Sequence, residues 1–179
     1  MRFLLLIITM TLTLLGSDTN HKMSQKQLHV LQAVRDVAKS IPDKNGKTYE
    51  NDLSAICLTE SSAGAHVLGD FRHKKSFTKA SLGAMQIQVA TARHISQNVK
   101  KLRWLNTLSD VQLAARLLGD ITLSAKIATY YVILLHEKRI DHFYAISGYN
   151  GGLTNRPYYD RVMKNKNIVD HLISDGQLS

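Results

Sequence analysis

Residues 53–64 read LSAICLTESSAG, and this stretch combines an apolar helical face with a single acid. Positions i, i+3, i+4 and i+7 of a helix share one face. Here these positions hold Leu53, Ile56, Cys57 and Glu60. The carboxylate of Glu60 therefore continues a face that points to the core. It does so at the end of the helix, because the sequence after Glu60 is typical of a helix stop.

Both burial and the helix end disfavour a charge on Glu60. Desolvation penalises the carboxylate anion, and the negative end of the helix dipole repels it. A carboxylic acid that keeps its proton near neutral pH is suited to be a general acid. We therefore expect Glu60 to be a catalytic acid. The alternative is a surface glutamate at a frayed helix end.

The length and the first residues suggest one exported domain. The chain has 179 residues, enough for a single domain with a real core, which we place at 24–175. Residues 1–17 hold one arginine and then a short apolar run, the layout of a secretory signal peptide. We expect a periplasmic or secreted protein with no stable membrane span after cleavage. An uncleaved anchor is the alternative, because no Ala-x-Ala motif precedes Ser17.

The charge is strongly basic, with 23 Lys and Arg against 14 Asp and Glu and a net charge of +9. In an exported protein this charge suits an anionic extracellular polymer or a membrane surface. No aromatic platform for single-stranded nucleic acid accompanies the basic residues. We therefore expect no nucleic-acid partner. A solvated cationic surface without a specific partner is the alternative.

The side chains that could bind a metal or react as a thiol show no motif. The single Cys57 lies on the apolar face, so we expect a buried, unreactive thiol. Five histidines show no metal-binding spacing within a helix, so we expect no metal and no cofactor. They are His66, His73, His94, His136 and His142.

Helical periodicity dominates the chain. Capping boxes at Ser24 and Ser109 begin two helices, and Asp120 caps a third. Residues 83–99 are expected to form a helix with an unusual entry. Residues 61–82 show no clear periodicity and predict a long loop with a short hairpin. With no βαβ alternation, the fold class is mainly α.

Two further segments carry polar chemistry. Residues 81–88 read SLGAMQIQ and place the amides of Gln86 and Gln88 two residues apart. Amides suit the hydroxyl and acetamido groups of a sugar. Residues 145–152 read AISGYNGG, and the glycines there let the backbone approach a ligand closely. Taken alone, each segment is also explained by a solvated helix start or an ordinary turn.

Taken together and in this order, these segments resemble the SLT-type lytic transglycosylases of peptidoglycan, a branch of the lysozyme-like superfamily. The matching residues are Glu60-Ser61, Gly83-Ala84-Met85-Gln86, Tyr131 and Tyr149-Asn150-Gly151-Gly152. The resemblance covers roughly residues 53–159. It implies a mainly α, lysozyme-like helical domain in which a long loop or small hairpin lines the active-site cleft.

The resemblance also implies a role for each matching residue. Glu60 would be the catalytic acid and then the base, and Tyr149 would hydrogen-bond Glu60. The substrate would be bound by Ser61, Gly83, Met85, Gln86, Gln88, Tyr131 and Asn150. The chain departs from the family pattern where Gln88 replaces Met and Gly148 replaces Ala, and the first change would make one wall of the sugar site more polar.

The implied reaction is that of a lyase. Glu60 would protonate the oxygen between N-acetylmuramic acid and N-acetylglucosamine, and would then take the proton of the C6 hydroxyl to leave a 1,6-anhydro end. Ordinary glycosidases need two carboxylates. The chain has only three glutamates, and no second acid lies in a comparable apolar setting.

Two alternatives stay open. One is a lysozyme-like muramidase in which Asp70 places a water molecule, and the other is a non-catalytic protein that binds glycan during assembly. The short single domain resembles those that open the wall locally for secretion machines, pili or conjugation. The expected partners are therefore a peptidoglycan strand and components of such machinery.

Overall fold

The computed structural model describes residues 22–69 and 76–179. The predicted signal peptide (1–17), Asp70 and His73 lie outside this part of the chain. The helices are α1 (Gln25–Lys39), α2 (Glu50–Ser61), α3 (Val89–Asn98), α4 (Asp110–Gly119), α5 (Ile121–Lys138), α6 (His142–Tyr149) and α7 (Arg156–Ser174). Two 3₁₀ helices are η2 (Phe77–Lys79) and η3 (Lys100–Thr107), and two short strands are β1 (Leu68–Gly69) and β2 (Ser81–Leu82).

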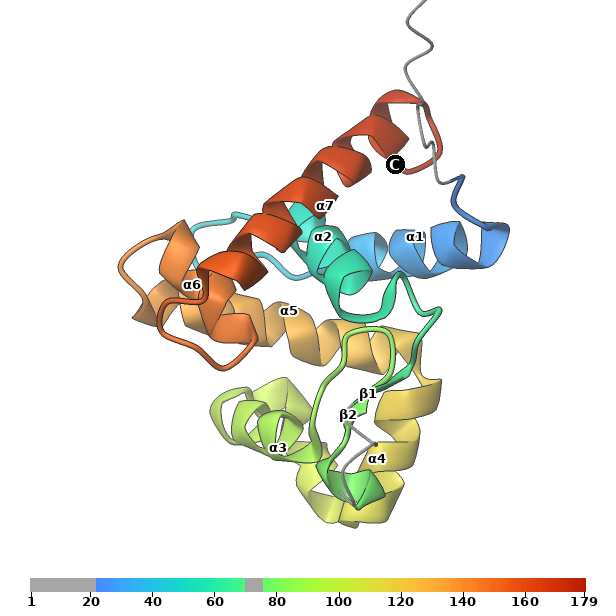
Figure 1. The fold of residues 1–179 in the computed structure, drawn as a ribbon. Helices are drawn as coiled ribbons and strands as arrows, with labels where there is room; N and C mark the ends of the chain where they lie inside the picture. Colours follow the sequence, from blue (N-terminus) through green and yellow to red (C-terminus); the bar gives the residue numbers. More distant parts are fainter. Residues whose placement is uncertain (1–21, 70–75) are drawn as a thin grey trace, which may run out of the picture.

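The fold is mainly helical with one small hairpin, as the sequence predicts. The two strands pair antiparallel, with Leu68 opposite Leu82 and Gly69 opposite Ser81. Figure 1 shows α5 between two groups of elements, with α1, α2 and α7 on one side and α3, α4 and the hairpin on the other. The mainly α prediction with a small hairpin is therefore confirmed.

The predicted helix starts are also confirmed. Each capping side chain accepts a hydrogen bond from the backbone N–H three residues further on, which satisfies a donor that the helix itself leaves unpaired. The predicted residues are Ser24, Ser109 and Asp120, and Asp141 caps α6 in the same way. Local sequence therefore fixes where these four helices begin.

The helix expected over 83–99 begins only at Val89. Residues before it form a tight turn, which Leu82 and Ile87 close with a pair of backbone hydrogen bonds of 3.2 and 3.0 Å. Inside the turn, Gly83 and Gln86 have φ angles of +74° and +50°. An α-helix cannot contain such angles, so this part of the prediction is wrong.

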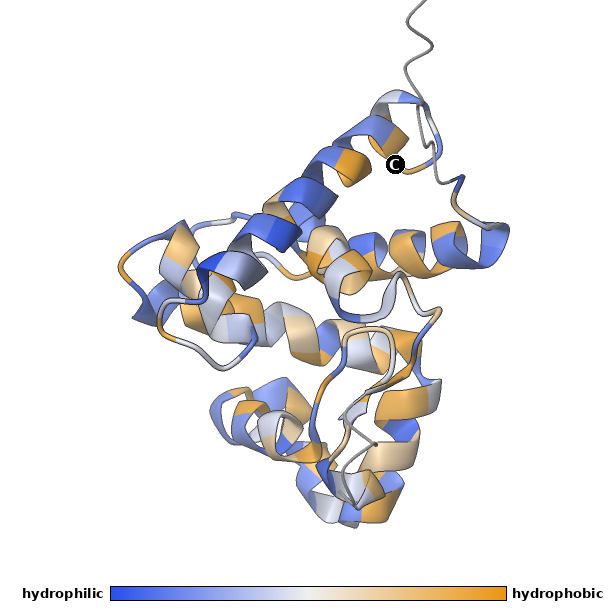
Figure 2. Cartoon of the chain, in the orientation of Figure 1, coloured by the Kyte–Doolittle hydropathy of each residue, from blue (hydrophilic) through white to orange (hydrophobic). Residues whose placement is uncertain are grey.

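Helix α2 lies at the centre of the fold and packs mainly against α7 and α1. Every side chain from Asp52 to Leu58 is buried. The predicted apolar face is buried as expected, but the opposite face is buried too, because α1 and α7 cover it. By contrast, most of the α7 ribbon in Figure 2 has the blue colour of hydrophilic residues.

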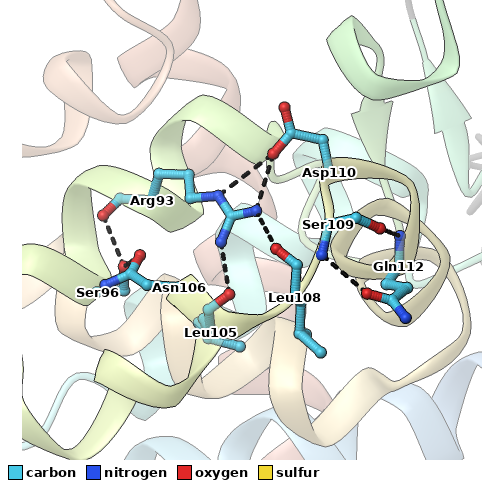
Figure 3. Close-up of polar contacts among 8 residues, drawn as sticks. All are labelled: Arg93, Ser96, Leu105, Asn106, Leu108, Ser109, Asp110 and Gln112. Carbon is cyan, nitrogen blue, oxygen red and sulfur yellow. Dashed lines mark hydrogen bonds and ion pairs between the residues drawn. The ribbon is translucent and has the colours of Figure 1, made fainter.

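A polar network holds α3, η3 and α4 together. On α3, the guanidinium group of Arg93 donates to the backbone carbonyl oxygens of Leu105 and Leu108 (Figure 3). It also pairs with Asp110, the first residue of α4, at 2.8 Å. These contacts satisfy carbonyl groups at the end of η3 and fix the position of α3.

Among the described residues, no single helix is both long and apolar enough to cross a membrane. Helices α4 and α5, which meet at 101°, satisfy that criterion as a bent pair by length and composition only.

Candidate active site

Glu60 is the penultimate residue of α2, and its side chain is half-buried. The helix ends abruptly after it, because Ser62, Ala63 and Gly64 all have positive φ angles of 50°, 54° and 77°. Such angles are uncommon for serine and alanine, and backbone of this kind is often found at functional sites. The predicted helix stop is therefore confirmed, and it leaves Glu60 at the rim of the core.

Tyr158, which the sequence analysis did not select, hydrogen-bonds Glu60. The hydroxyl of Tyr158, on α7, donates to Oε1 of Glu60 at 2.6 Å. Burial and the neighbouring Glu60 raise the pKa of Tyr158 far above its usual value, so the hydroxyl keeps its proton. The side chain is 1% exposed and therefore has little freedom to move. Tyr158 thus fixes one carboxylate oxygen of Glu60.

Tyr149 supports the turn opposite Glu60. Its hydroxyl donates to the backbone carbonyl oxygen of Met85 at 2.9 Å, which corrects the expected bond from Tyr149 to Glu60. Burial, followed by the charge of Glu60, raises the pKa of Tyr149. Its ring centroid lies 5.3 Å from that of Tyr131. In turn, the Tyr131 hydroxyl donates to the carbonyl oxygen of Gly148 at 3.0 Å.

Ser61 is a buried part of the framework beside Glu60. Its side chain is 1% exposed. Its hydroxyl donates to the carbonyl oxygen of Ala84 at 2.7 Å and accepts from the N–H of Gly64 at 2.8 Å. The predicted contact of Ser61 with substrate stays a prediction, and in the structure both described partners of the hydroxyl are internal. Ser61 instead joins the end of α2 to the turn.

Gly83 and Met85 are also structural. A Cβ atom at Gly83 would collide with the backbone carbonyl oxygen of Leu117, and the φ of +74° favours glycine. Met85 is fully buried, and its carbonyl group receives the Tyr149 hydrogen bond. Neither residue lines the pocket described next. Both shape the turn, and their predicted role in binding stays a prediction.

A pocket of about 210 Å³ opens beside Glu60. It is lined by Glu60, Ser81, Gln86, Ile87, Gln88, Thr91, Tyr131, Tyr149, Asn150 and Gly151. The structure therefore brings six of the predicted site residues together, from α2, the turn, α5 and the end of α6. Sequence reasoning missed Ser81, Ile87 and Thr91, although two of them lie within the quoted segment 81–88.

Amide groups are prominent in the pocket lining. Nε2 of Gln86 donates to the carbonyl oxygen of Gly83 at 2.9 Å, and this bond fixes the orientation of the amide. Nε2 of Gln88 lies 3.5 Å from Oγ of Ser81. Asn150 is exposed, and its Oδ1 accepts a hydrogen bond from Asn155 at 3.0 Å. The pocket thus presents neutral donors and acceptors, which suit an uncharged polar ligand.

Glu60 is the acidic side chain at this pocket. Among the described residues that line it, Glu60 is the one carboxylate. Cys57, on the same helix, supplies no thiolate, because burial raises its pKa to about 12. Its expected state as a buried, unreactive thiol is confirmed. The arrangement can transfer a proton between Glu60 and a polar ligand that the amides hold.

A comparison with known proteins identifies the family of this chain. The chain matches the family model described as the transglycosylase SLT domain over residues 40–170. No curated protein and no solved structure matched it significantly. The matched region contains every residue that lines the pocket. It also spans well over half of the sequence and confirms the resemblance drawn from the motifs, so this chain belongs to the SLT transglycosylase domain family.

Proposed function

We propose that this protein is an exported lytic transglycosylase that cleaves between N-acetylmuramic acid and N-acetylglucosamine and leaves a 1,6-anhydro end. Family membership supports lytic transglycosylase activity in general, with peptidoglycan as the substrate. One observation carries the finer proposal: the hydrogen bond from buried Tyr158 to Glu60 beside a pocket with one described carboxylate.

In this mechanism Glu60 first acts as an acid. It donates its proton to the glycosidic oxygen, the bond to C1 of the muramic acid breaks, and the acetamido group of the substrate stabilises the positive charge. Glu60, now a carboxylate, then removes the proton of the C6 hydroxyl, whose oxygen bonds to C1. The proton that left Glu60 is thereby replaced, and no water is consumed.

Tyr158 can serve both steps because a phenol hydroxyl both donates and accepts hydrogen bonds. It can donate to Glu60 when the carboxylate is charged, since its hydroxyl lies 2.6 Å from Oε1. It can accept from Glu60 when the acid is protonated. A buried ring that stays in place through both states would keep Glu60 aligned with the glycosidic oxygen and then with the C6 hydroxyl.

The chemistry of the pocket supports a glycan ligand. Gln86, Gln88 and Asn150 offer amide donors and acceptors for hydroxyl and acetamido groups. Gln86 and Gln88 flank Ile87 in the sequence, and both amides line the pocket. We propose that these residues bind the sugars on either side of the cleaved bond.

The proposed setting is the bacterial periplasm or the cell exterior. The apolar start of the chain supports export, and the net charge of +9 suits an anionic cell-wall polymer. Within that setting we propose local wall opening, in association with a secretion, pilus or conjugation apparatus. This last part depends on the family resemblance alone.

The test of the proposed site is release of soluble muropeptides from purified peptidoglycan by the wild type and two glutamine variants. Glu60→Gln is expected to lower the rate by at least about 1,000-fold, because an amide cannot transfer the proton. Glu137→Gln is the matched control, since its half-exposed carboxylate lies outside the pocket. The proposed role of Glu60 would be contradicted if both variants lost the same activity. It would also be contradicted if the Glu60→Gln enzyme released muropeptides at the wild-type rate.

A further inference from the structure

A second polar cluster joins the same helices that carry the pocket residues. Asp52 lies on α2, His136 on α5 and His142 on α6. Asp52 precedes the pocket residue of α2 by eight positions, which is about 12 Å along the helix. The pocket residues of these three helices are Glu60, Tyr131 and Tyr149. The cluster and the pocket therefore occupy different parts of one three-helix unit.

The cluster has the geometry of a metal site. One ring nitrogen of His136, one of His142 and one carboxylate oxygen of Asp52 all lie within 4.8 Å of one another. Nδ1 of His142 is 3.8 Å from Oδ2 of Asp52, and the two imidazole centroids are 5.4 Å apart. Ligands at roughly 2.0–2.1 Å from a tetrahedral zinc ion lie about 3.4 Å from one another. A small inward movement of the side chains would bring all three atoms onto one ion.

Burial makes this cluster costly without a ligand. Asp52 is 8% exposed. Nε2 of His136 is buried and has no hydrogen-bond partner among residues 22–69 and 76–179. A buried polar atom without a partner loses the solvation that it has in the unfolded chain. Coordination of a cation would compensate the solvation that the imidazole nitrogen and the carboxylate lose on burial.

The protonation of His136 also suits coordination. Burial, followed by the charge of His142, lowers the pKa of His136 to about 4. The ring is therefore neutral at physiological pH, and a metal does not have to displace a proton from it. Burial raises the pKa of Asp52, and the charges of His142, Lys166 and Lys47 act in the opposite direction. A bound cation would favour the ionised carboxylate further.

The donor set selects the kind of metal. Two imidazole nitrogens and one carboxylate oxygen favour zinc and similar transition metals over magnesium or calcium, which prefer oxygen. Lys47 and Lys166 repel cations in general, and this repulsion has to be overcome by strong nitrogen ligands. The two lysines line a surface hollow together with Asp52 and His142, so an ion can reach the cluster from solvent.

We propose that Asp52, His136 and His142 bind one zinc-type divalent ion that joins α2, α5 and α6. Half-buried His142 leaves room for solvent to complete the coordination. The sequence analysis expected no metal because no two histidines share a metal-binding spacing within one helix. Spacing within one helix cannot reveal this cluster, because each of the three residues comes from a different helix. This proposal does not depend on the proposed transglycosylase function.

The test is zinc binding to the purified chain after treatment with EDTA and removal of the chelator. Calorimetric titration with zinc chloride is expected to show one ion per chain. With zinc at 100 times its dissociation constant, the Tm should rise by roughly 5–10 °C. Cobalt(II), used as a spectroscopic substitute, should give visible absorption bands of a low-symmetry site.

Variants decide whether the three residues form the site. His142→Ala is expected to weaken zinc binding by at least roughly 100-fold. The side chain is half-buried, and circular dichroism checks that the variant is folded. His94→Ala is the control, because His94 is exposed on α3, away from the cluster. Absence of zinc binding by the wild type would overturn the proposal. Equal affinity in His142→Ala and wild type would do so too.

Discussion

The hydroxyl of Tyr158 on α7 donates a 2.6 Å hydrogen bond to Oε1 of Glu60 at the end of α2. These two helices form the most extensive helix pair in the structure. Tyr158 is almost completely buried in their interface, whereas Glu60 lies at its rim beside the pocket. The packing of α2 on α7 therefore determines where the proposed acid points. This relationship leads directly to the first prediction.

Replacing Tyr158 with phenylalanine should lower the rate of peptidoglycan cleavage by roughly 10–100-fold, because the carboxyl group of Glu60 loses its fixed orientation. The hydroxyl also favours the charged carboxylate. Without it the protonated acid is favoured, so the alkaline limb of the pH–rate profile, where Glu60 loses its proton, should move to higher pH. Unfolding free energy should fall by only about 1–2 kcal/mol.

The control is Tyr159→Phe, since Tyr159 neither lines the pocket nor contacts Glu60 in any described hydrogen bond. An unchanged profile in Tyr158→Phe would contradict a positioning role.

Replacing Ser61 with alanine should destabilise the fold by about 1–3 kcal/mol. The carbonyl of Ala84 and the N–H of Gly64 would each lose a buried partner. Urea denaturation measures this loss, and Ser76→Ala, at an exposed position, is the control. A substrate contact at Ser61 would behave differently: KM would rise while the unfolding free energy stayed constant. That pattern would restore the role that the sequence suggested.

Replacing Gly83 with alanine should cost at least about 1–3 kcal/mol. The φ of +74° is strained for alanine, and the added Cβ meets the backbone of Leu117, which cannot rotate away as a side chain can. Gly119→Ala is a matched control in the same region, because a Cβ there meets nothing within 4 Å. Thermal unfolding of both variants checks the prediction. Equal stability of the two would show that the turn tolerates a side chain.

The stability of the metal-free protein should fall as the pH falls from about 6.5 to about 4. Burial lowers the pKa of His136 to about 4, whereas an unfolded histidine titrates near pH 6.5. Between these values the unfolded chain binds more protons than the folded chain, so unfolding free energy rises with pH. Denaturation in EDTA across this range, compared with His136→Gln, measures the effect. A variant with the same pH slope as the wild type would assign the titration to other groups.

Sequence reasoning succeeded where the signal is local. Caps such as Ser109 and the stop after Glu60 depend on a few adjacent residues, and the structure has them as predicted. The sequence does not decide which tyrosine lies on the buried face of α7. Both Tyr158 and Tyr159 precede Val162 by three or four residues, so either fits the helical spacing. In the folded protein Tyr158 is the buried one of the two, and its hydroxyl donates a hydrogen bond to Glu60.

The remaining differences arise from contacts between distant segments. Ser61 resembles a ligand-binding residue by its place beside Glu60, but the turn at Ala84, 23 residues away, takes its hydroxyl. In the same way, His136 and His142 meet Asp52 only because α5 and α6 fold back on α2. No pattern within one helix contains such information. The three motif segments nevertheless located the pocket, since each contributes to its lining.

The most direct test of the proposed reaction is cleavage of purified peptidoglycan in water enriched in oxygen-18, followed by mass spectrometry of the muropeptides. Transfer of the C6 hydroxyl to C1 predicts 1,6-anhydro-N-acetylmuramic acid ends without any label. Products that are heavier by one water and carry oxygen-18 at the reducing end would contradict this account. They would make the protein a muramidase that activates water.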